Sequence, residues 1–476
     1  MTSGDNNDQL HIVFVHLDLG IGGAEQLVLQ LATASQDLGY RVDLVTTRCD
    51  QDHCFAAVHQ PEGRLSSNVY VYGRWIPSNV LGMGTALMST LRMLYITYQV
   101  TRLPQHKTAH VVVMDVLPTS LPLLLQWLPS AGILFYCHFP DKLLLRSRGG
   151  RFKQWYRRIL DSMEESTMGL ADTLVVNSKF TLSQVRQHFT SFSSRKDIGV
   201  LYPALDTSNM VQANHEKKSN QSPIVSLNRF ERKKNVGLLI EAYAYMRQRD
   251  PKKVLPPLII AGGYDTQNVE NVEYRGELGQ LAKTLNVSVD FRLDISDGDR
   301  AILFQTALCV VYTPDKEHFG IVPLEAMFAG TPVLAVNSGG PTETIVDGET
   351  GFLRSPTAQD FGDALLTLID DPSRATTMGI AGREHVEKTF GPKRFEKEWK
   401  GLVDETKKRG VARKNGNQQH HVKFVLWMNV SLYLLEAALA LLLVTALTWL
   451  AQQSGILKPS QSILGKVRSH FQHGEL

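Results

Sequence analysis

One segment, from Glu317 to Val336, constrains the fold of this chain more than any other. It reads Glu317-His-Phe-Gly-Ile-Val-Pro-Leu-Glu325-Ala-Met-Phe-Ala-Gly330-Thr-Pro332-Val-Leu-Ala-Val336. Proline is favoured at the first position of a helix, and glycine is favoured just beyond the last turn. The segment therefore predicts a helix that starts at Pro323 and ends at Gly330, followed by an apolar strand. Glu325 is then expected in the first helical turn and Glu317 in the loop before it.

The start of this helix is suited to binding an anion. The first N–H groups of a helix have no partner inside it, and the helix dipole adds positive potential there. The backbone N–H groups of Gly320, Ile321 and Val322 can therefore meet a phosphate, which leaves Glu317 and Glu325 to hold sugar hydroxyls. Two glutamates at this spacing also occur by chance in soluble helices, so the prediction of a nucleotide-sugar site depends on the flanking sequence.

Two α/β patterns follow one another along the 476 residues, a length typical of two or three domains. The first opens with an apolar run at 10–16, a glycine-containing turn and an amphipathic helix at 24–32. A polar stretch at 211–223 separates it from the second, in which strands and helices again alternate. Both patterns are typical of parallel sheets covered by helices, which bind ligands at the carboxyl ends of their strands.

The turn of the first pattern reads Asp18-Leu-Gly20-Ile-Gly22-Gly23-Ala-Glu25. A dehydrogenase-type fingerprint would require glycine at position 25, so this turn does not predict a dinucleotide site. Gly22 and Gly23 instead predict close approach of the backbone to a phosphate or a sugar. A tight turn without a ligand is the alternative.

A basic turn follows the first strand of the second pattern, Asn228-Arg229-Phe-Glu-Arg-Lys233-Lys234-Asn235. Arginine offers two parallel hydrogen bonds and lysine a point charge, so the turn can stabilise the charge on a departing nucleoside diphosphate. A solvated turn without a ligand is the alternative. In the first pattern, His138 follows an apolar strand at 133–136 and is expected at its carboxyl end, although a lone histidine is more often structural.

Read together, these segments resemble known enzymes. The E-x7-E segment, Gly330-Thr-Pro332-Val and Ser338-Gly-Gly-Pro341-Thr-Glu343 resemble the donor site of retaining glycosyltransferases with the GT-B architecture. Residues 10–400 are more narrowly similar to the bifunctional α-1,3/α-1,6-mannosyltransferases of dolichol-linked oligosaccharide assembly. The segments that carry this similarity are Gly20-Ile-Gly-Gly-Ala-Glu, Cys137-His-Phe-Pro-Asp, Asn228-Arg-Phe-Glu-Arg-Lys-Lys-Asn and Tyr312-Thr-Pro-Asp-Lys-Glu-His-Phe-Gly.

The resemblance implies an α/β fold with two Rossmann-like domains facing each other across a cleft. Residues 1–210 would bind the acceptor and residues 211–403 the nucleotide sugar. The implied reaction moves mannose, with retention, from GDP-mannose to Man1GlcNAc2-diphosphodolichol in α-1,3 and then α-1,6 linkage, in the synthesis of the N-glycan precursor. The alternatives are another GT-B enzyme with a lipid acceptor, a nucleotide-sugar epimerase and an inactive membrane scaffold.

The resemblance also implies roles for the candidate residues. Glu317 would bind or orient the donor mannose, and His138 would face the reacting sugar. Glu325 would hold the ribose, while Arg229 and Lys234, with the five-residue spacing of the family, would contact the diphosphate. Lys233 is the residue with which Lys234 could be confused. Gly22 and Gly23 would let the first turn close on the diphosphate or the acceptor.

No cofactor is implied and no metal is expected. Asp297-Gly-Asp299 has the D-x-D pattern that binds metal in another glycosyltransferase fold. Here Ser296 and Asp297 directly precede a helical pattern, so they are expected to cap that helix. The four cysteines include no C-x-x-C pair, and the net charge of +3 gives no field of the kind that nucleic-acid binders show.

An apolar segment at 424–451 contains a single charge, Glu436, and exceeds the ~20 residues that a spanning helix needs. Lys and Arg are more frequent in the basic segment at 404–423 than in the tail at 452–476. The positive-inside rule therefore places the catalytic region in the cytosol, on the endoplasmic reticulum membrane by resemblance. The resemblance is also compatible with a complex with other glycosyltransferases of the pathway.

Two further stretches, 80–100 and 121–128, predict helices more apolar than a soluble domain requires. Proline at 118, 122 and 129 argues against a second span. Contact with the membrane surface or the lipid acceptor and burial in an ordinary core are both compatible with this pattern.

Overall fold

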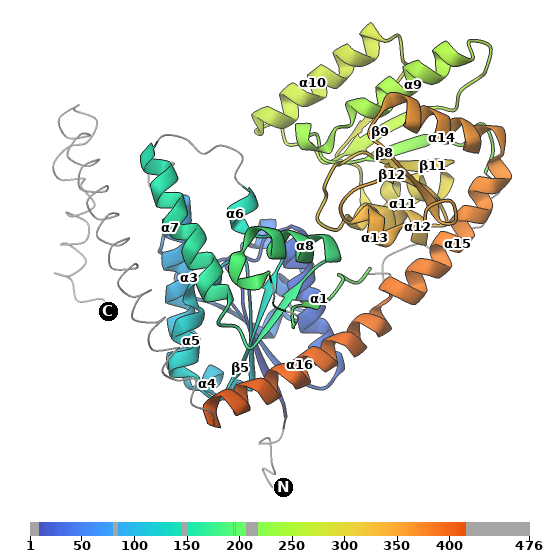
Figure 1. Cartoon of the computed structure of the whole chain (residues 1–476). Helices are drawn as coiled ribbons and strands as arrows, with labels where there is room; N and C mark the ends of the chain where they lie inside the picture. The colour runs from blue at the N-terminus through green and yellow to red at the C-terminus, as the bar shows by residue number, and fades with distance from the viewer. Residues whose placement is uncertain are drawn as a thin grey trace, which may run out of the picture. The chain divides into compact units, whose positions relative to one another are not determined.

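The structure is a computed structural model of the chain, and it describes residues 9–79, 84–144, 151–193, 195, 197–205 and 218–415 (Figure 1). The chain forms two compact units. The first comprises Met1–Tyr136, Asp141–Leu174 and Leu402–Leu476. The second comprises Cys137–Pro140 and Val175–Gly401.

The N-terminal half of the chain forms a seven-stranded sheet with the order β3-β2-β1-β4-β5-β6-β7. Strands β1 to β5 pair in parallel, as do β6 and β7. The strands are β1 His11–Val15, β2 Arg41–Thr46, β3 Val69–Val71, β4 Val111–Asp115, β5 Gly132–Cys137, β6 Thr173–Val176 and β7 Gly199–Val200. The central strands are buried along their length, because helices cover both faces of a parallel sheet.

The helices that connect these strands include both apolar stretches of the sequence, as α3 and α5. They are α1 Gly23–Asp37, α2 Ala56–His59, α3 Thr85–Arg102, α4 Pro104–Lys107, α5 Leu121–Trp127, α6 Asp141–Leu144, α7 Arg151–Met168 and α8 Lys179–His188. Short 3₁₀ turns lie at Gln51–His53, Ser66–Asn68, Pro118–Ser120 and Thr190–Phe192.

The second unit contains a six-stranded parallel sheet with the order β10-β9-β8-β11-β12-β13. Its strands are β8 Ile224–Leu227, β9 Leu258–Gly262, β10 Asp290–Leu293, β11 Cys309–Tyr312, β12 Val333–Val336 and β13 Gly351–Arg354. Alternate residues of one strand point to opposite faces, so Ile224 joins one buried apolar cluster and Val225 the other.

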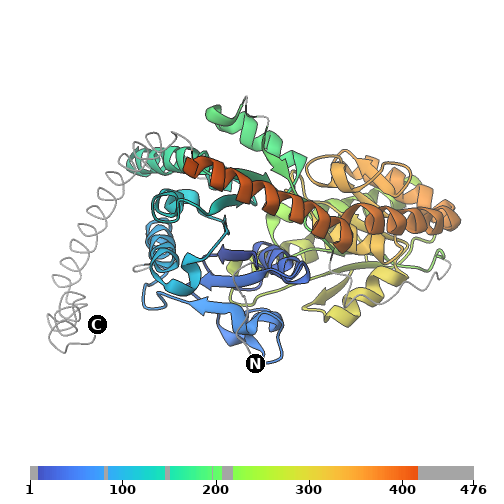
Figure 2. The ribbon, with the colours of Figure 1, turned by 90° about the horizontal axis from the view of Figure 1, so that it is seen from below.

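The helices of this half are α9 Gly237–Arg249, α10 Val269–Thr284, α11 Asp297–Thr306, α12 Ile321–Phe328, α13 Pro341–Thr344, α14 Ala358–Asp370, α15 Pro372–Phe390 and α16 Pro392–Asn415. A 3₁₀ turn at Arg232–Lys234 follows β8. Helix α16 is continuous in both views of the ribbon and contributes residues to both units (Figures 1 and 2).

The predicted spanning helix at 424–451 lies outside the described residues. Among the helices that the structure does describe, none combines the length and apolar composition that a bilayer crossing requires.

Candidate active site

Most of the predicted donor-site residues lie where the second sheet changes its winding direction. Successive strands run outward from β8 to β10 on one side and from β11 to β13 on the other. Ligands of such sheets bind at this switch point, outside the carboxyl ends of the strands. The turn after β8 carries Arg229 and Lys234, and the loop after β11 carries Glu317.

Lys234 and Glu317 form the centre of this site. The Lys234 Nζ lies 2.5 Å from Oε2 of Glu317, and the Tyr312 hydroxyl donates to the same oxygen at 3.3 Å. Both charged side chains are largely buried, with 14% and 21% exposed. Burial alone would raise the pKa of Glu317, but the charge and hydrogen bond of Lys234 outweigh it and lower that pKa. Glu317 is therefore a carboxylate at neutral pH.

The structure separates the three other cationic side chains of the basic turn from this pair. Arg229 is 65% exposed and lies 3.0 Å from Glu231, to which Lys233 is also paired at 2.9 Å. Arg232 instead contacts two glutamates of α10. Lys234, and not Lys233, is thus the lysine that meets Glu317.

Helix α12 starts earlier than the sequence predicts. It begins at Ile321 after Gly320, whose φ of 82° lies in the left-handed region, and Pro323 is its third residue rather than its first. Proline is tolerated there because the third N–H of a helix also lacks an intrahelical partner. The prediction that Glu325 lies in the first turn is therefore wrong, since it is the fifth residue. The predicted glycine at the helix end is confirmed by Gly330, with φ of 78°.

The N–H groups of Ile321 and Val322 do lie at the start of α12, next to the capping residue Gly320. Glu325 is 8% exposed, and its Oε1 lies 3.5 Å from Nη1 of Arg300. Burial raises the pKa of Glu325 to about 7, although Arg300 opposes this effect. Its buried Oε2 has no hydrogen-bond partner within the described residues. A buried acceptor of this kind suits a ligand hydroxyl.

The Ser338–Gly340 turn packs directly against the backbone of Glu317. The Gly340 N–H donates to the carbonyl of Glu317 at 2.7 Å. Gly339 has φ of 66°, and a Cβ there would lie 2.4 Å from the same carbonyl oxygen. The sequence indicated this turn only through resemblance and gave no reason for its two glycines.

A further role that sequence reasoning missed belongs to Glu343, in α13. Its carboxylate accepts from the N–H groups of Lys179 and Phe180, at 2.8 and 2.6 Å, and from the hydroxyl of Tyr202 at 2.9 Å. All of these residues belong to the second unit. The position of an acidic residue after Gly-Gly-Pro is the only signal that could have singled it out.

His138 follows β5, as predicted, in the short segment Cys137–Pro140 that belongs to the second unit. Its side chain is half-buried. The ring of Phe139 stacks on that of His318, with centroids 3.6 Å apart. Burial lowers the pKa of His318 to about 4, so this ring is neutral. The residue after His138 is thus in contact with the residue after Glu317.

Gly22 and Gly23 lie in the first unit, at the start of α1. Gly22 caps the helix, and a Cβ there would lie 2.4 Å from Oε2 of Glu25. Glu25 in turn approaches His16 at 3.8 Å, and His16 Nδ1 is 2.8 Å from Asp115. Burial alone would lower the pKa of His16, but Asp115 and then Glu25 raise it to about 10. Sequence reasoning missed this charged cluster at the ends of β1 and β4.

The two aspartates of the D-x-D pattern lie in the first turn of α11, and Ser296 before them caps the helix, whereas Asp297 does not. The Ser296 hydroxyl accepts from the N–H of Asp299 at 3.1 Å, and the Asp297 side chain is 93% exposed. The predicted capping role of Ser296 is confirmed. Within the described residues, no group of three or more His, Cys, Asp or Glu side chains could hold a metal ion.

Comparison with known sequences gives two matched families in order along the chain. Residues 21–209 match "Glycosyltransferase Family 4", and residues 207–385 match "Glycosyl transferases group 1". The alpha-1,3/1,6-mannosyltransferase of Homo sapiens is 40% identical over 398 residues, which cover 81% of this chain and 93% of that protein. Its counterpart in Schizosaccharomyces pombe is 37% identical, over 89% of this chain and 88% of that protein.

Solved structures show the same fold at lower identity. Sucrose-phosphate synthase from Thermosynechococcus elongatus has a TM-score of 0.64 and 20% identity, over 83% of this chain and 98% of that one. The catalytic domain of starch synthase IV from Arabidopsis thaliana has a TM-score of 0.61 and 13% identity, over 84% and 100%. The predicted GT-B fold, with its two parallel Rossmann-like sheets, is confirmed.

Proposed function

Because this chain belongs to the alpha-1,3/1,6-mannosyltransferase family of dolichol-linked oligosaccharide synthesis, we propose that its donor is GDP-mannose and its first acceptor Man1GlcNAc2-diphosphodolichol. The enzyme would add mannose in α-1,3 linkage and then, to the two-mannose product, in α-1,6 linkage. In each step the bond from mannose C1 to the diphosphate breaks, and a bond from C1 to an acceptor hydroxyl oxygen forms.

The observation that carries this proposal is the Lys234–Glu317 pair at the switch point of the second sheet. The donor diphosphate would lie at the start of α12, where the N–H groups of Ile321 and Val322 and the helix dipole favour an anion. Lys234 has three N–H donors, so it can keep its bond to Glu317 and still contact a phosphate. Arg229 is exposed and could rotate toward the same group. These cations would stabilise the charge that grows on the departing diphosphate.

The remaining roles follow from burial and charge. Glu317, an ionised carboxylate, would accept hydrogen bonds from the donor mannose and fix its orientation. Glu325, with an unpartnered buried oxygen, would accept the ribose hydroxyls. His138 would face the reacting sugar from the segment that contacts the Glu317 loop. Gly22 would leave room for the acceptor or the diphosphate at the start of α1.

The decisive experiment uses the purified full-length chain in detergent. GDP-mannose and UDP-sugars would each be offered with lipid-linked chitobiose bearing one mannose. We expect transfer only from GDP-mannose, and none with Glu317→Ala, whose thermal unfolding should match that of the wild type. Transfer from a UDP-sugar would overturn the donor assignment. Incubation with GDP-mannose alone tests for epimerisation, which should not occur.

We also propose that residues 424–451 cross the endoplasmic reticulum membrane once, with the catalytic region in the cytosol. The support is the apolar length of this segment and the excess of Lys and Arg before it. Protease added to sealed microsomes should digest the catalytic region and spare a tag placed after Leu476. Digestion of that tag would indicate that the segment does not cross.

A further inference from the structure

The first sheet also has a point at which its winding direction changes, and it lies between β1 and β4. Successive strands run outward from β1 to β3 on one side and from β4 to β7 on the other. Ligands of such sheets bind at this point, outside the carboxyl ends of the strands. Val15 of β1 is in register with Met114 of β4. The residues that follow them, His16 and Asp115, therefore meet where a ligand of the first unit is expected.

His16 is a buried ring that keeps one hydrogen-bonding position open. Its Nδ1 lies 2.8 and 2.9 Å from the two carboxylate oxygens of Asp115. Burial alone would lower the pKa of His16, but Asp115 and then Glu25 raise it to about 10, so both ring nitrogens carry a proton at neutral pH. Its Nε2 lies 3.8 Å from Oε1 of Glu25, which is longer than a hydrogen bond. The Nε2–H group can therefore still donate to a ligand.

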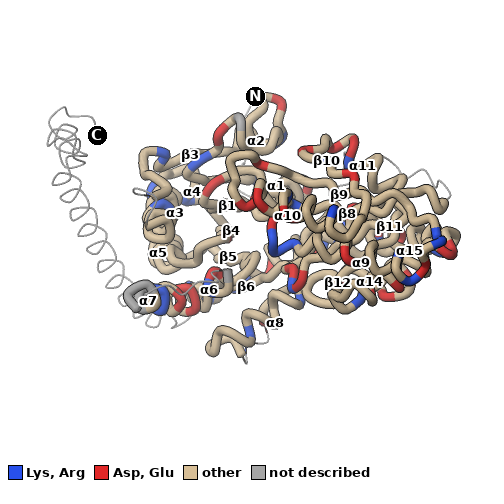
Figure 3. Tube along the Cα trace, turned by 90° about the horizontal axis from the view of Figure 1, so that it is seen from above, with Lys and Arg blue, Asp and Glu red and all other residues tan. Residues whose placement is uncertain are grey.

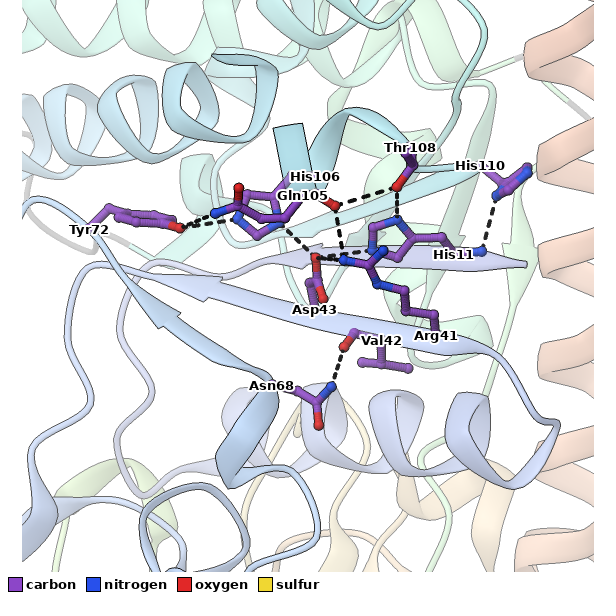
Figure 4. A network of polar contacts seen from close by, with 10 residues as sticks. All are labelled: His11, Arg41, Val42, Asp43, Asn68, Tyr72, Gln105, His106, Thr108 and His110. Carbon is purple, nitrogen blue, oxygen red and sulfur yellow. Dashed lines mark hydrogen bonds and ion pairs between the residues drawn. The ribbon is translucent and has the colours of Figure 1, made fainter. Parts of the chain in front are cut away.

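A second histidine network, at the amino end of β1, has no such open position (Figure 4). His11 contacts Thr108 through Nδ1 at 2.9 Å and Asp43 through Nε2 at 3.0 Å. His106 contacts the same aspartate through Nδ1 at 2.7 Å and Tyr72 through Nε2 at 3.2 Å. Each of these ring nitrogens has a partner, as expected for buried polar groups that only support the fold. The ring at the carboxyl end of β1 uses one of its two nitrogens in this way.

Glu25 supplies a carboxylate next to this open position. It is the third residue of α1 and one of the acidic positions drawn red in Figure 3. Burial alone would raise the pKa of Glu25, but His16 lowers it, so this side chain, 23% exposed, is ionised. A glutamate at the third helical position can also accept from the N–H of the capping residue. Capping of α1 is therefore the alternative role of Glu25.

The other carboxylate of the glycine turn, Asp18, is already neutralised. It pairs with Arg92, whose side chain is 2% exposed, and it accepts from the hydroxyl of Thr47 at 2.9 Å. These contacts fix the turn to α3 and to the residue after β2. Within the described residues, the ion-pair partner of Glu25 is the His16 ring. The Glu25 carboxylate therefore retains the capacity to accept hydrogen bonds from a ligand.

The backbone after Asp115 is strained. Val116 has φ of 62°, in the left-handed region that a β-branched residue rarely adopts. The Leu117 N–H closes this turn by donating to the carbonyl of Asp115 at 2.7 Å. Strain of this kind persists where the surrounding structure over-determines the backbone, and it clusters at ligand sites. It therefore agrees with a binding role for the carboxyl end of β4.

The charge of this cluster selects the kind of ligand. One imidazolium, His16, lies between the carboxylates of Asp115 and Glu25, so the three side chains carry a net negative charge. A phosphate is disfavoured there, because like charges repel. A sugar hydroxyl can donate to a carboxylate and at the same time accept from an imidazolium N–H. The cluster therefore suits the hydroxyl groups of an uncharged sugar.

From these observations we propose that one hydroxyl of the acceptor glycan binds at the switch point of the first sheet, where it accepts from His16 Nε2 and donates to the Glu25 carboxylate. Asp115 is a positioning residue, because it acts by holding the ring of His16. The proposal rests on the proposed transfer to a lipid-linked acceptor, and it adds residues of the first unit that hold the sugar of that acceptor.

The first test compares Glu25→Gln with the wild type, as full-length protein in detergent. Glutamine serves as well as glutamate in a capping box, so this variant keeps the capping role and loses the charged acceptor. Loss of a hydrogen bond to a charged group should lower kcat/KM for the one-mannose lipid-linked acceptor about 10- to 100-fold. The KM for GDP-mannose and the Tm should be unchanged. The matched control, Glu62→Gln at an exposed position of the first unit, should behave as the wild type.

The second test identifies the hydroxyl. Acceptor analogues that each lack one sugar hydroxyl would be offered to the wild type and to Glu25→Gln. The analogue without the bound hydroxyl should be a poor substrate of the wild type, and Glu25→Gln should lose nothing further with it, because the contact is already absent. Additive losses for every analogue would contradict a direct contact.

The buried part of the cluster needs a paired variant. Removing one partner of a buried ion pair leaves the other charge unpaired and can unfold the protein. His16→Gln with Asp115→Asn removes both charges together. The paired variant should also lower kcat/KM for the acceptor and leave the KM for GDP-mannose unchanged. Adding Glu25→Gln to it should cause little further loss, because the same hydroxyl is involved.

An unchanged kcat/KM for the acceptor in Glu25→Gln would assign this residue to capping alone and overturn the proposal. A rise in the KM for GDP-mannose without loss of acceptor efficiency would also overturn it, since the cluster would then serve the donor. Failure of the proposed function would appear in the same assay as absence of transfer by the wild type, so the two failures can be distinguished.

Discussion

The charge on Glu317 depends mainly on one neighbour. The carboxylate is largely buried, and burial opposes ionisation, so Lys234, with a smaller contribution from His318, keeps its pKa low. Arg229 has no part in this, because its guanidinium is exposed and faces Glu231. Two cations that the sequence treats as equivalent therefore differ in what they do before the donor binds.

This difference gives the first prediction. Arg229→Ala and Lys234→Ala should each cost about 2–4 kcal/mol of transition-state stabilisation, because each removes a cation that would contact the departing diphosphate. Only Lys234→Ala should also move the acidic limb of the kcat/KM profile to higher pH, since burial then raises the pKa of Glu317. The Arg229 variant is the control. Superimposable acidic limbs in the two variants would contradict the pairing.

Glu325 is predicted to make donor binding pH-dependent. Its pKa is raised to about 7 by burial, so it loses its charge as the pH falls through 7. The KM for GDP-mannose should therefore rise below pH 7 in the wild type. In Glu325→Gln it should be high at all pH values, by about 10- to 100-fold, as expected for loss of a charged acceptor.

The ionisation of Glu325 also affects the free energy of unfolding of the protein. A raised pKa in the folded state means that ionised Glu325 destabilises the native protein, with the loss developing as the pH rises from the unfolded pKa of about 4.5 to 7. Glu325→Gln removes that charge, so its free energy of unfolding at pH 8 should not fall below that of the wild type. A clear loss of stability there would show that Arg300 more than compensates the buried charge.

At the scale of elements, the site is a loop held between a helix start and a glycine turn. Gly320 lets α12 begin two residues before Pro323, and Gly339 lets the next turn approach the backbone of Glu317. The loop that carries Glu317 is therefore held by close backbone contact with this turn, in addition to side-chain contacts such as the stacking of His318 on Phe139.

Gly339→Ala should consequently impair catalysis. Its φ of 66° makes alanine strained by about 1–2 kcal/mol, and the new Cβ would collide with the Glu317 carbonyl. Gly348→Ala is the matched control, since φ there is 80° but no atom lies within 4 Å of the added Cβ. Both variants should lower Tm, and only Gly339→Ala should lower kcat strongly. Equal kcat values would show that the turn does not position Glu317.

At the scale of the whole molecule, the sequence carries one E-x7-E segment, one Arg229–Lys234 pair and one His138 strand end. Each matched glycosyltransferase family is also found once along the chain. A second donor site would have no such residues from which to be built. We therefore predict that both linkages are made in one donor site, with two orientations of the acceptor.

Substitutions at Glu317 or Lys234 should depress α-1,3 and α-1,6 transfer together, because donor activation is common to both. Changes around Gly22, or around Leu143 in α6, could separate them, because residues 1–210 would bind the acceptor. The measurement offers one-mannose and two-mannose acceptors in parallel assays. A donor-site variant that lost α-1,3 transfer and kept full α-1,6 transfer would refute the single site.

The sequence by itself determined what depends on local chemistry. Apolar runs predicted a strand before the basic turn at 228–235 and a strand that ends at Val336, and the structure confirms them as β8 and β12. Gly330 after an apolar helix and Ser296 before another marked a helix end and a helix start correctly. The GT-B fold followed from the order of such elements together with the resemblance. The roles of Glu317, Glu325 and His138 in binding or catalysis remain predictions.

Only the tertiary structure decided which side chains meet, because contacts between distant segments depend on strand order and not on spacing. In the structure Lys234, and not Lys233, is the partner of Glu317, although more than 80 residues separate the two in the sequence. It joined His16, Glu25 and Asp115 into a charged cluster and tied α4 to β2 through His106 and Asp43. Sequence patterns predict the two ends of such contacts separately. The winding of the sheets brings them together.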